Sequence, residues 1–284
     1  MTEWNKDRVA RLLSRCGAIA MEHFDSPVRE YKKDATVVTQ ADRAIEAFLS
    51  EELDRPEEGS FVLGEETLEG RSEEYISSAL KKTAWIVDPI DGTVSYAYHF
   101  PMWGVSIGLA RGGVISEGAL YLPVAGEMLV GCQEGIFFGR VAPGTEDPGP
   151  RLAPFTPPFH RPDSRRIIAL AQGHAKRSLF SGGNALHATG SAVFSLAHLA
   201  LGNYLAYRAS LKLWDLAGAV GLLARAGFLM RFDDGRPFGT SIDETLYRLD
   251  PGEGPMRWKA RGRVIFAPSE EAAAYVLSLF NSPA

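Results

Sequence analysis

Two closely spaced carboxylates at the end of a short apolar run are the residues here most suited to chemistry. Residues 85–87 read Trp-Ile-Val, and Asp88 and Asp91 follow three positions apart. At about 4 Å, two such charges repel each other by about 4 kcal/mol at an effective dielectric constant near 20. A hard divalent cation between them would reverse that repulsion, because such ions prefer oxygen ligands. A turn capped by aspartate explains the same stretch as well.

Further acidic residues stand at other element ends. Glu65 and Glu66 follow a short apolar run, and Asp215 stands where an apolar helix is expected to open. Thr39 and Asp42 have the spacing of a capping box, with Asp where Glu is usual. A solvated loop, an N-cap and a capping box are the ordinary explanations of these three features. Taken singly, none of them requires a metal ion.

Hydrophobic spacing predicts the elements that must position these carboxylates. Helical periodicity is found at residues 9–20 and 39–53. Strands are expected at residues 61–63, 85–87, 105–110, 114–121 and 128–131, with the second of these stopped at Asp88-Pro89. Because glycine or proline turns join the later strands closely, antiparallel pairing is favoured there.

A change of composition divides the chain. Residues 141–163 contain seven prolines and little periodicity, as in a connection or long surface loop. Beyond it, strands are expected at 167–171, 204–207, 228–232 and 264–267, and helices at 192–201, 216–226 and 271–280. This alternation is typical of an α/β unit. We therefore expect an N-terminal α+β lobe at 1–140, with most of the acidic residues, and a C-terminal α/β lobe at 164–284.

Bulk properties narrow the functional classes. The chain has 284 residues, 45% of them apolar, and a net charge of -5, so we expect no nucleic-acid partner. The charged N-terminus and the lack of a run of about 18 apolar residues predict neither a secretory signal nor a membrane span. The two cysteines, Cys16 and Cys132, have no metal-site spacing and argue against a disulfide scaffold. A cytoplasmic location is the expectation.

Taken in order, the acidic motifs carry a resemblance. The sequence reads VTQAD at 38–42, GEE at 64–66, WIVDPIDGT at 85–93 and WDLAGA at 214–219. This series resembles the inositol monophosphatase family, within the superfamily that includes fructose-1,6-bisphosphatase. YLPVAGEM at 121–128 and RVIFAPSEEAAAYVL at 263–277 are also similar to the family. The resemblance implies a layered αβαβα sugar-phosphatase fold, with an antiparallel N-terminal sheet and a mixed C-terminal sheet.

The resemblance also implies a catalytic set around two or three Mg²⁺ ions. The implied metal ligands are Glu65, Asp88, the Ile90 carbonyl, Asp91 and Asp215, with Glu66 in the same shell through water. Thr93, with Glu65, would orient and help to deprotonate the attacking water, and Asp42 would lie near that nucleophile or a third ion. These side-chain types suit magnesium, which takes carboxylate, carbonyl and water oxygens.

Substrate contacts are implied in the same way. The backbone amides of Gly92 and Thr93 would hold phosphate oxygens, and Ser191, Ala192 and Asp215 would lie at the substrate. The main departure is Arg208, where the family usually has a glutamate that accepts hydrogen bonds from inositol hydroxyls. An arginine cannot accept such bonds, but it can hold a second phosphate, a carboxylate or a neighbouring acidic side chain.

The sequence therefore predicts a magnesium-dependent phosphomonoesterase acting on a small phosphate ester. Inositol 1-phosphate ranks first, and fructose 1,6-bisphosphate, histidinol phosphate and adenosine 3′,5′-bisphosphate stay open as alternatives. Resemblance also implies inhibition by lithium and a homodimer. The alternative from another class is a regulatory binding protein that kept the fold and lost the chemistry. A decayed enzyme should have lost at least one metal ligand, whereas this chain has every matched one.

Overall fold

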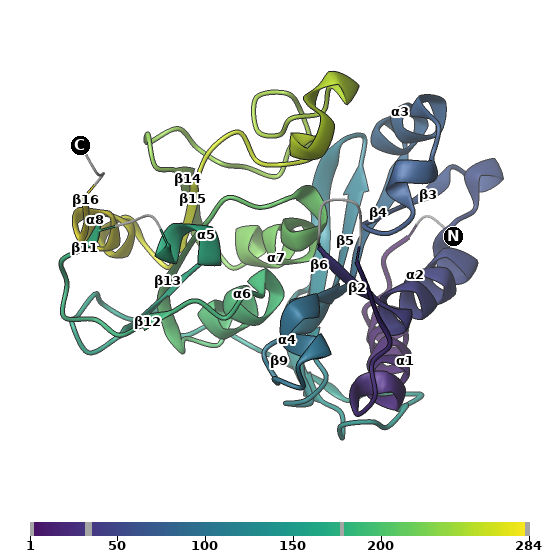
Figure 1. Ribbon diagram of the computed structural model, residues 1–284, viewed down its shortest axis with the longest axis horizontal. Coiled ribbons are helices and arrows are strands. Elements are labelled where there is room, and N and C mark those ends of the chain that lie inside the picture. Colours follow the sequence, from purple (N-terminus) through teal and green to yellow (C-terminus); the bar gives the residue numbers. More distant parts are fainter. Residues whose placement is uncertain (1–2, 32–35, 177–178, 282–284) are drawn as a thin grey trace.

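Helices and sheets alternate in five layers, in the order α–β–α–β–α (Figure 1). The computed structural model describes residues 3–31, 36–176 and 179–281. Helices α1 (Lys6–Phe24) and α2 (Gln40–Leu53) form one outer layer, and α8 (Glu270–Ser278) lies in the other. The layered prediction and the mixed α/β class are confirmed.

The first sheet has seven strands in the order β3-β4-β5-β6-β7-β8-β9. Their bounds are β3 (Ser60–Gly64), β4 (Thr83–Asp91), β5 (Gly104–Arg111), β6 (Val114–Leu122), β7 (Glu127–Cys132), β8 (Gly135–Arg140) and β9 (Leu152–Pro154). From β4 to β9 every pair is antiparallel, and the short connections predicted this pairing for β5, β6 and β7. Strand β3 differs, because it runs parallel to β4.

The second sheet is mixed and has the order β12-β10-β13-β15-β14. Its strands are β10 (Ile167–Leu170), β12 (Leu186–His187), β13 (Tyr204–Ala209), β14 (Leu229–Phe232) and β15 (Val264–Ala267). Strand β10 is parallel to β12 and β13, whereas β15 is antiparallel to β13 and β14. Shorter elements complete the chain: β1 (Arg29–Tyr31), β2 (Val37–Thr39), η1 (Pro56–Glu58), η2 (Leu68–Gly70), α3 (Glu73–Lys81), α4 (Thr93–Ala97), α5 (Gln172–Ala175), β11 (Leu179–Phe180), η3 (Pro251–Met256) and β16 (Phe280–Asn281).

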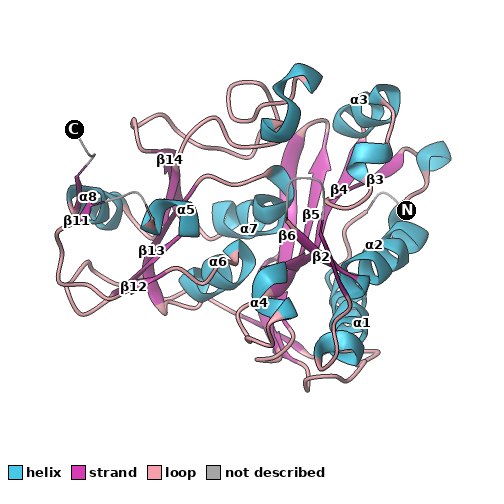
Figure 2. Ribbon diagram, in the orientation of Figure 1, coloured by secondary structure: helices cyan, strands magenta, loops and turns pink. Residues whose placement is uncertain are grey.

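The central layer consists of α6 (Ala192–Ala200) and α7 (Leu213–Arg225), which lie between the two sheets (Figure 2). Both helices are apolar on nearly every side, which is the pattern of a helix buried all round. Helix α7 packs very closely on β6: a Cβ added at Gly118 would come within 1.9 Å of the carbonyl oxygen of Gly218. This close packing fixes the start of α7 relative to the first sheet.

Two local predictions need correction. Pro89 does not stop the strand at Asp88, because β4 continues to Asp91 through a register shift against β5. Strand β3 pairs with β4 only as far as Val87, so Pro89 lies beyond that ladder at an irregularity, where a missing N–H costs little. Asp215 does not cap its helix either, because α7 begins at Leu213 with Lys212 in the capping position.

The proline-rich stretch 141–163 contains one strand, β9, which joins the first sheet beside β8. The division into lobes 1–140 and 164–284 stays a prediction. Within the described residues, none of the helices combines the length and the apolar character needed to cross a bilayer. Both cysteines are free and buried.

Candidate metal centre and active site

Three carboxylates from distant parts of the chain meet between the two sheets. Glu65 directly follows β3, Asp88 is in β4, and Asp215 is in the first turn of α7. Each contributes one carboxylate oxygen, and these three oxygens lie within 4.8 Å of one another. The Asp215 carboxylate also accepts a hydrogen bond from the Lys212 backbone N–H at 2.9 Å, which holds it at the helix start.

Asp88 is the residue of this group that most requires a cation. Its side chain is 1% exposed, and neither carboxylate oxygen has a hydrogen-bond partner among the described residues. Burial of an unpaired charge costs several kcal/mol, so buried carboxylates are normally paired, protonated or bound to metal. Three carboxylate oxygens converging at this spacing are the donors that Mg²⁺ and Ca²⁺ prefer, so the residues fit a hard divalent ion.

Asp91 lies in the same strand but faces the central helix layer. Its Oδ2 atom accepts hydrogen bonds from the Ser191 hydroxyl at 2.5 Å and from the Val193 backbone N–H at 2.6 Å. Ser191 is the N-cap of α6, and its hydroxyl oxygen also accepts from the Phe194 N–H at 3.0 Å. The carboxylate therefore interacts favourably with the positive end of this helix. Asp91 and Glu66, also predicted as ligands, are outside the group of three oxygens.

Thr93 connects the bulged strand end to α2. Its hydroxyl lies 3.0 Å from the Ile90 carbonyl oxygen and 3.4 Å from Oδ1 of Asp42. Asp42 is 1% exposed, and its other oxygen accepts from the N–H and the hydroxyl of Thr39, at 2.8 and 2.5 Å. The capping box predicted at Thr39 and Asp42 is thus present, with one Asp42 oxygen directed toward Thr93.

Gly92 makes the sharp turn between β4 and α4. Its φ of 92° is in the left-handed region, where an L-residue is strained. A Cβ there would also come within 2.8 Å of Ser191 Cβ and 3.0 Å of the Met102 carbonyl oxygen. Glycine is therefore needed for backbone shape and for space.

One buried acid escaped the sequence analysis. Glu46, on the buried face of α2 one turn after Asp42, is 1% exposed. Its carboxylate accepts from the backbone N–H groups of Glu66 at 2.8 Å and Thr67 at 2.7 Å, and so it holds the turn that carries Glu65. A glutamate at an otherwise apolar helix position was the available signal.

Burial and mutual repulsion make protonation of these acids easier than in water. Burial, followed by the charges of Glu65 and Asp91, raises the pKa of Asp88 well above its ordinary value. Burial and the same two neighbours also raise the pKa of Asp215. Burial raises the pKa of Asp91 to about 7, although the bonds from Ser191 and Val193 oppose this rise. Burial likewise raises the pKa of Asp42 to about 6. A bound cation would favour the charged forms.

A cavity of about 580 Å³ has Asp91 among its lining residues, whereas Glu65, Asp88 and Asp215 do not line it. Gly190, Ala192, Lys259 and Arg263 also line this cavity. Arg208, expected at the substrate, is not among them. Its Nε and Nη2 atoms donate to Oδ1 and Oδ2 of Asp233 at 3.0 and 2.5 Å, and its side chain is 8% exposed.

Comparison with known proteins identifies the family. The model of the inositol monophosphatase family matches residues 6–276, so the chain belongs to the inositol monophosphatase family. A Neurospora crassa protein named quinic acid degradation cluster protein x is 29% identical over 232 residues, covering 72% of this chain and 68% of its own. An inositol monophosphatase of Dictyostelium discoideum is 26% identical over 223 residues, covering 76% of this chain and 80% of its own.

Solved structures agree on the fold. A structure described as an IMPase/NADP phosphatase complexed with Mg²⁺ and phosphate matches with a TM-score of 0.72 and 17% identity. The match covers 97% of this chain and 94% of that one. At this identity the similarity establishes the shared architecture.

Proposed function

We propose that this protein is a magnesium-dependent phosphomonoesterase that hydrolyses a small phosphorylated metabolite. The buried Asp88 carboxylate, unpaired and within 4.8 Å of two further carboxylate oxygens, is the observation that carries the proposal. Family membership supports the phosphatase class. Glu65, Asp88 and Asp215 would hold the ions, joined by Asp91, the Ile90 carbonyl and, through water, Glu66. When bound, two or three Mg²⁺ ions would supply Lewis acidity to the phosphate and the attacking water.

The chain's own groups can orient the water and move its proton. The Thr93 hydroxyl is within reach of both Asp42 and the Ile90 carbonyl, so it can donate to one of them and accept from a water. The Oδ1 atom of Asp42 lies 3.4 Å from the Thr93 hydroxyl, so Asp42 would take the proton through Thr93, together with Glu65. In the balanced reaction, the water oxygen forms a bond to phosphorus, the ester P–O bond breaks, and the leaving oxygen gains a proton.

The phosphate site is proposed at the start of α4. The first N–H groups of a helix have no partner within the helix, and the left-handed turn at Gly92 precedes those of Thr93 and Val94. The amides of Gly92 and Thr93 would donate to phosphate oxygens there. The alcohol part of the substrate would extend toward Ala192 and the hydroxyl of Ser191, which Asp91 holds in place.

The identity of the alcohol part of the substrate stays open among small phosphorylated metabolites. An inositol 1-phosphate-like ester ranks first by family, and the Dictyostelium relative supports that choice. The Neurospora relative, named for quinic acid degradation, adds phosphate esters of cyclic hydroxy acids. Fructose 1,6-bisphosphate, histidinol phosphate and adenosine 3′,5′-bisphosphate complete the set. Lithium inhibition and a homodimer also belong to the proposal by family likeness.

Phosphate release from this panel, with Mg²⁺ and with EDTA, tests the proposal. We expect turnover of at least one ester that requires Mg²⁺ and falls with millimolar Li⁺. Asp91→Asn should reduce kcat/KM by about 10–100-fold, since the variant weakens a predicted ligand and its contacts with α6. Unchanged release in this variant would refute the role given to Asp91, and no release from any ester would favour a regulatory binding protein.

A further inference from the structure

The cavity beside the metal centre has opposite charges among its lining residues. Among the described residues that line it, Asp91 is acidic, whereas Lys259 and Arg263 are basic and come from a different segment of the chain. Polar residues such as Gln172 and Ser210 also line it. A cavity of about 580 Å³ is within the range for small-molecule sites and has room for an ester with a second functional group.

Arg263 belongs to a group with more positive than negative charge. Its Nε donates to Oδ2 of Asp233 at 2.7 Å, and the same carboxylate also binds Arg208. Two guanidinium groups thus share one carboxylate, which leaves one net positive charge. His174, which also lines the cavity, adds none at neutral pH, because burial and the two arginines lower its pKa to about 4. The Arg263 side chain is 45% exposed, so its remaining N–H groups are accessible.

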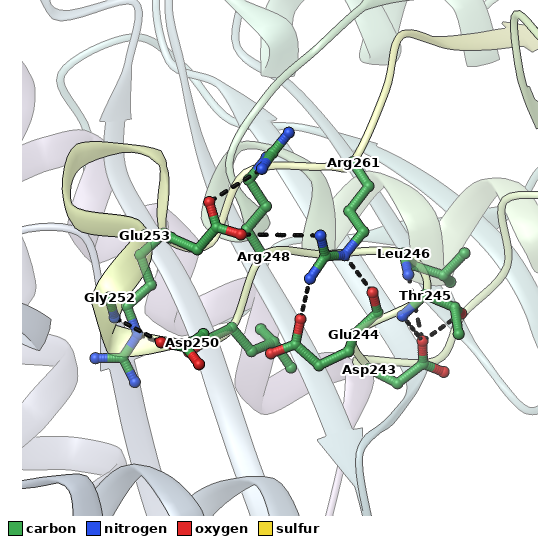
Figure 3. Close-up of polar contacts among 11 residues, drawn as sticks. Asp243, Glu244, Thr245, Leu246, Arg248, Asp250, Gly252, Glu253 and Arg261 are labelled. Atoms are coloured by element: carbon green, nitrogen blue, oxygen red, sulfur yellow. Dashed lines mark hydrogen bonds and ion pairs between the residues drawn. The ribbon is translucent and has the colours of Figure 1, made fainter.

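Lys259 is held in place by its backbone and has no acidic partner among the described residues. Its carbonyl oxygen accepts from the Arg248 N–H at 3.0 Å, and residue 259 pairs with Lys212, three residues before Asp215. The arginines around it have acidic partners: Arg248 pairs with Glu253 at 3.0 Å, and Arg261 pairs with Glu244 (Figure 3).

We propose that the substrate carries a second anionic group, a carboxylate or a phosphate, which binds Lys259 and Arg263 while the scissile phosphate lies at the metal centre. This inference rests on the proposed phosphatase function and deepens it. Both second groups offer oxygens that accept charge-assisted hydrogen bonds from ammonium and guanidinium groups. A neutral polyol would leave Lys259, and the one excess positive charge of the group formed by Arg208, Arg263 and Asp233, without a counter-charge in the complex.

Matched substrate pairs test this inference. Glycerol 3-phosphate and 3-phosphoglycerate differ in a hydroxymethyl group against a carboxylate, and fructose 1-phosphate and fructose 1,6-bisphosphate differ in the second phosphate. We expect kcat/KM to be at least tenfold higher for the doubly anionic member of at least one pair. In Lys259→Gln and Arg263→Gln that ratio should fall about tenfold each, the usual scale for a hydrogen bond to a charged group.

Lys81→Gln is the matched control, because Lys81 is an exposed lysine at the end of α3. It should leave every ratio as in the parent protein. The melting temperature of each variant checks folding, and Arg208 still pairs with Asp233 in Arg263→Gln. Equal turnover within both pairs, or ratios unaffected by both substitutions, would overturn the second anion site while the phosphatase stands. No Mg²⁺-dependent release from any ester would instead overturn the proposed function.

Discussion

Asp88→Asn should make the metal-free protein more stable and remove most of its response to Mg²⁺. Carboxylate oxygens of Glu65, Asp88 and Asp215 lie within 4.8 Å of one another, so each charged pair repels by about 3.5 kcal/mol at an effective dielectric constant of 20. Shorter separations would raise this figure, whereas the raised pKa of Asp88 and Asp215 lets protons relieve part of the repulsion. Asparagine keeps the shape, removes one charge and adds an N–H₂ donor.

We therefore expect the variant to gain about 1–3 kcal/mol in free energy of unfolding in EDTA, comparable to other replacements of buried charges. At roughly 2–4 °C per kcal/mol, the melting temperature should rise by about 2–12 °C. Mg²⁺ should narrow this difference, and should reverse it where the gain in EDTA is below about 2.7 kcal/mol. A 100-fold excess over the dissociation constant stabilises the parent protein by about 2.7 kcal/mol, whereas the variant should gain far less.

Thermal unfolding in EDTA and across a Mg²⁺ series measures both effects. Asp54→Asn is the matched control, because Asp54 is well paired: it accepts from the Tyr75 hydroxyl at 2.6 Å and forms an ion pair with Arg71 at 2.7 Å. This control should melt lower than the parent protein with and without metal. A lower melting temperature of Asp88→Asn in EDTA, or a parent protein that ignores Mg²⁺, would refute the reasoning.

Three further predictions concern pH, positioning and packing. Burial raises the pKa of Asp42 to about 6 and of Asp91 to about 7, above unfolded values of about 4, so the native state binds more protons in that window. Stability in EDTA should therefore fall as pH rises from about 4 to about 7, and Mg²⁺ should flatten this fall in melting curves. Glu46→Gln loses an acceptor for the Glu66 or Thr67 N–H, so it should weaken Mg²⁺ binding by about 10–100-fold in calorimetry. Glu74→Gln, at an exposed position of α3, should leave Mg²⁺ binding unchanged. Gly118→Ala should lower the melting temperature through about 1–3 kcal/mol of overpacking against Gly218, unlike Gly70→Ala, where a Cβ meets nothing; equal melting temperatures would contradict this packing.

Much of the architecture was predictable from local patterns. Apolar periodicity found the helices of the outer and central layers, and short turns predicted the antiparallel pairing of β5, β6 and β7. The meeting of Asp88 with Asp215, 127 positions later, came instead from the family motifs, because residue spacing carries no information on such distant contacts. Helix α7, which carries Asp215, packs closely on the first sheet through Gly118 and Gly218, and Asp88 belongs to that sheet.

Details that depend on contacts between neighbouring elements were missed in the sequence analysis. Pro89 predicts a strand end by its lack of an N–H, but the neighbouring strand β3 has already stopped pairing there, so β4 continues. Glu46 was not singled out from the sequence, yet α2 turns it inward toward the N–H groups of the turn at Glu66. In both cases the local preference of the residue is real, but the position of a neighbouring element decides whether the strand ends or the side chain meets solvent.

The position of Arg208 shows the same effect for charge. From the sequence alone, a second phosphate, a carboxylate and a nearby acidic side chain stayed open as partners for this arginine. Because β13 lies next to β15, which in turn pairs with β14, Arg208 and Arg263 both reach Asp233, just after β14. One carboxylate can neutralise only one of the two guanidinium groups there. One net positive charge therefore remains, and Arg263 carries it at the cavity. A substitution at position 208 should therefore be felt at Arg263, 55 positions away, through the shared Asp233 carboxylate.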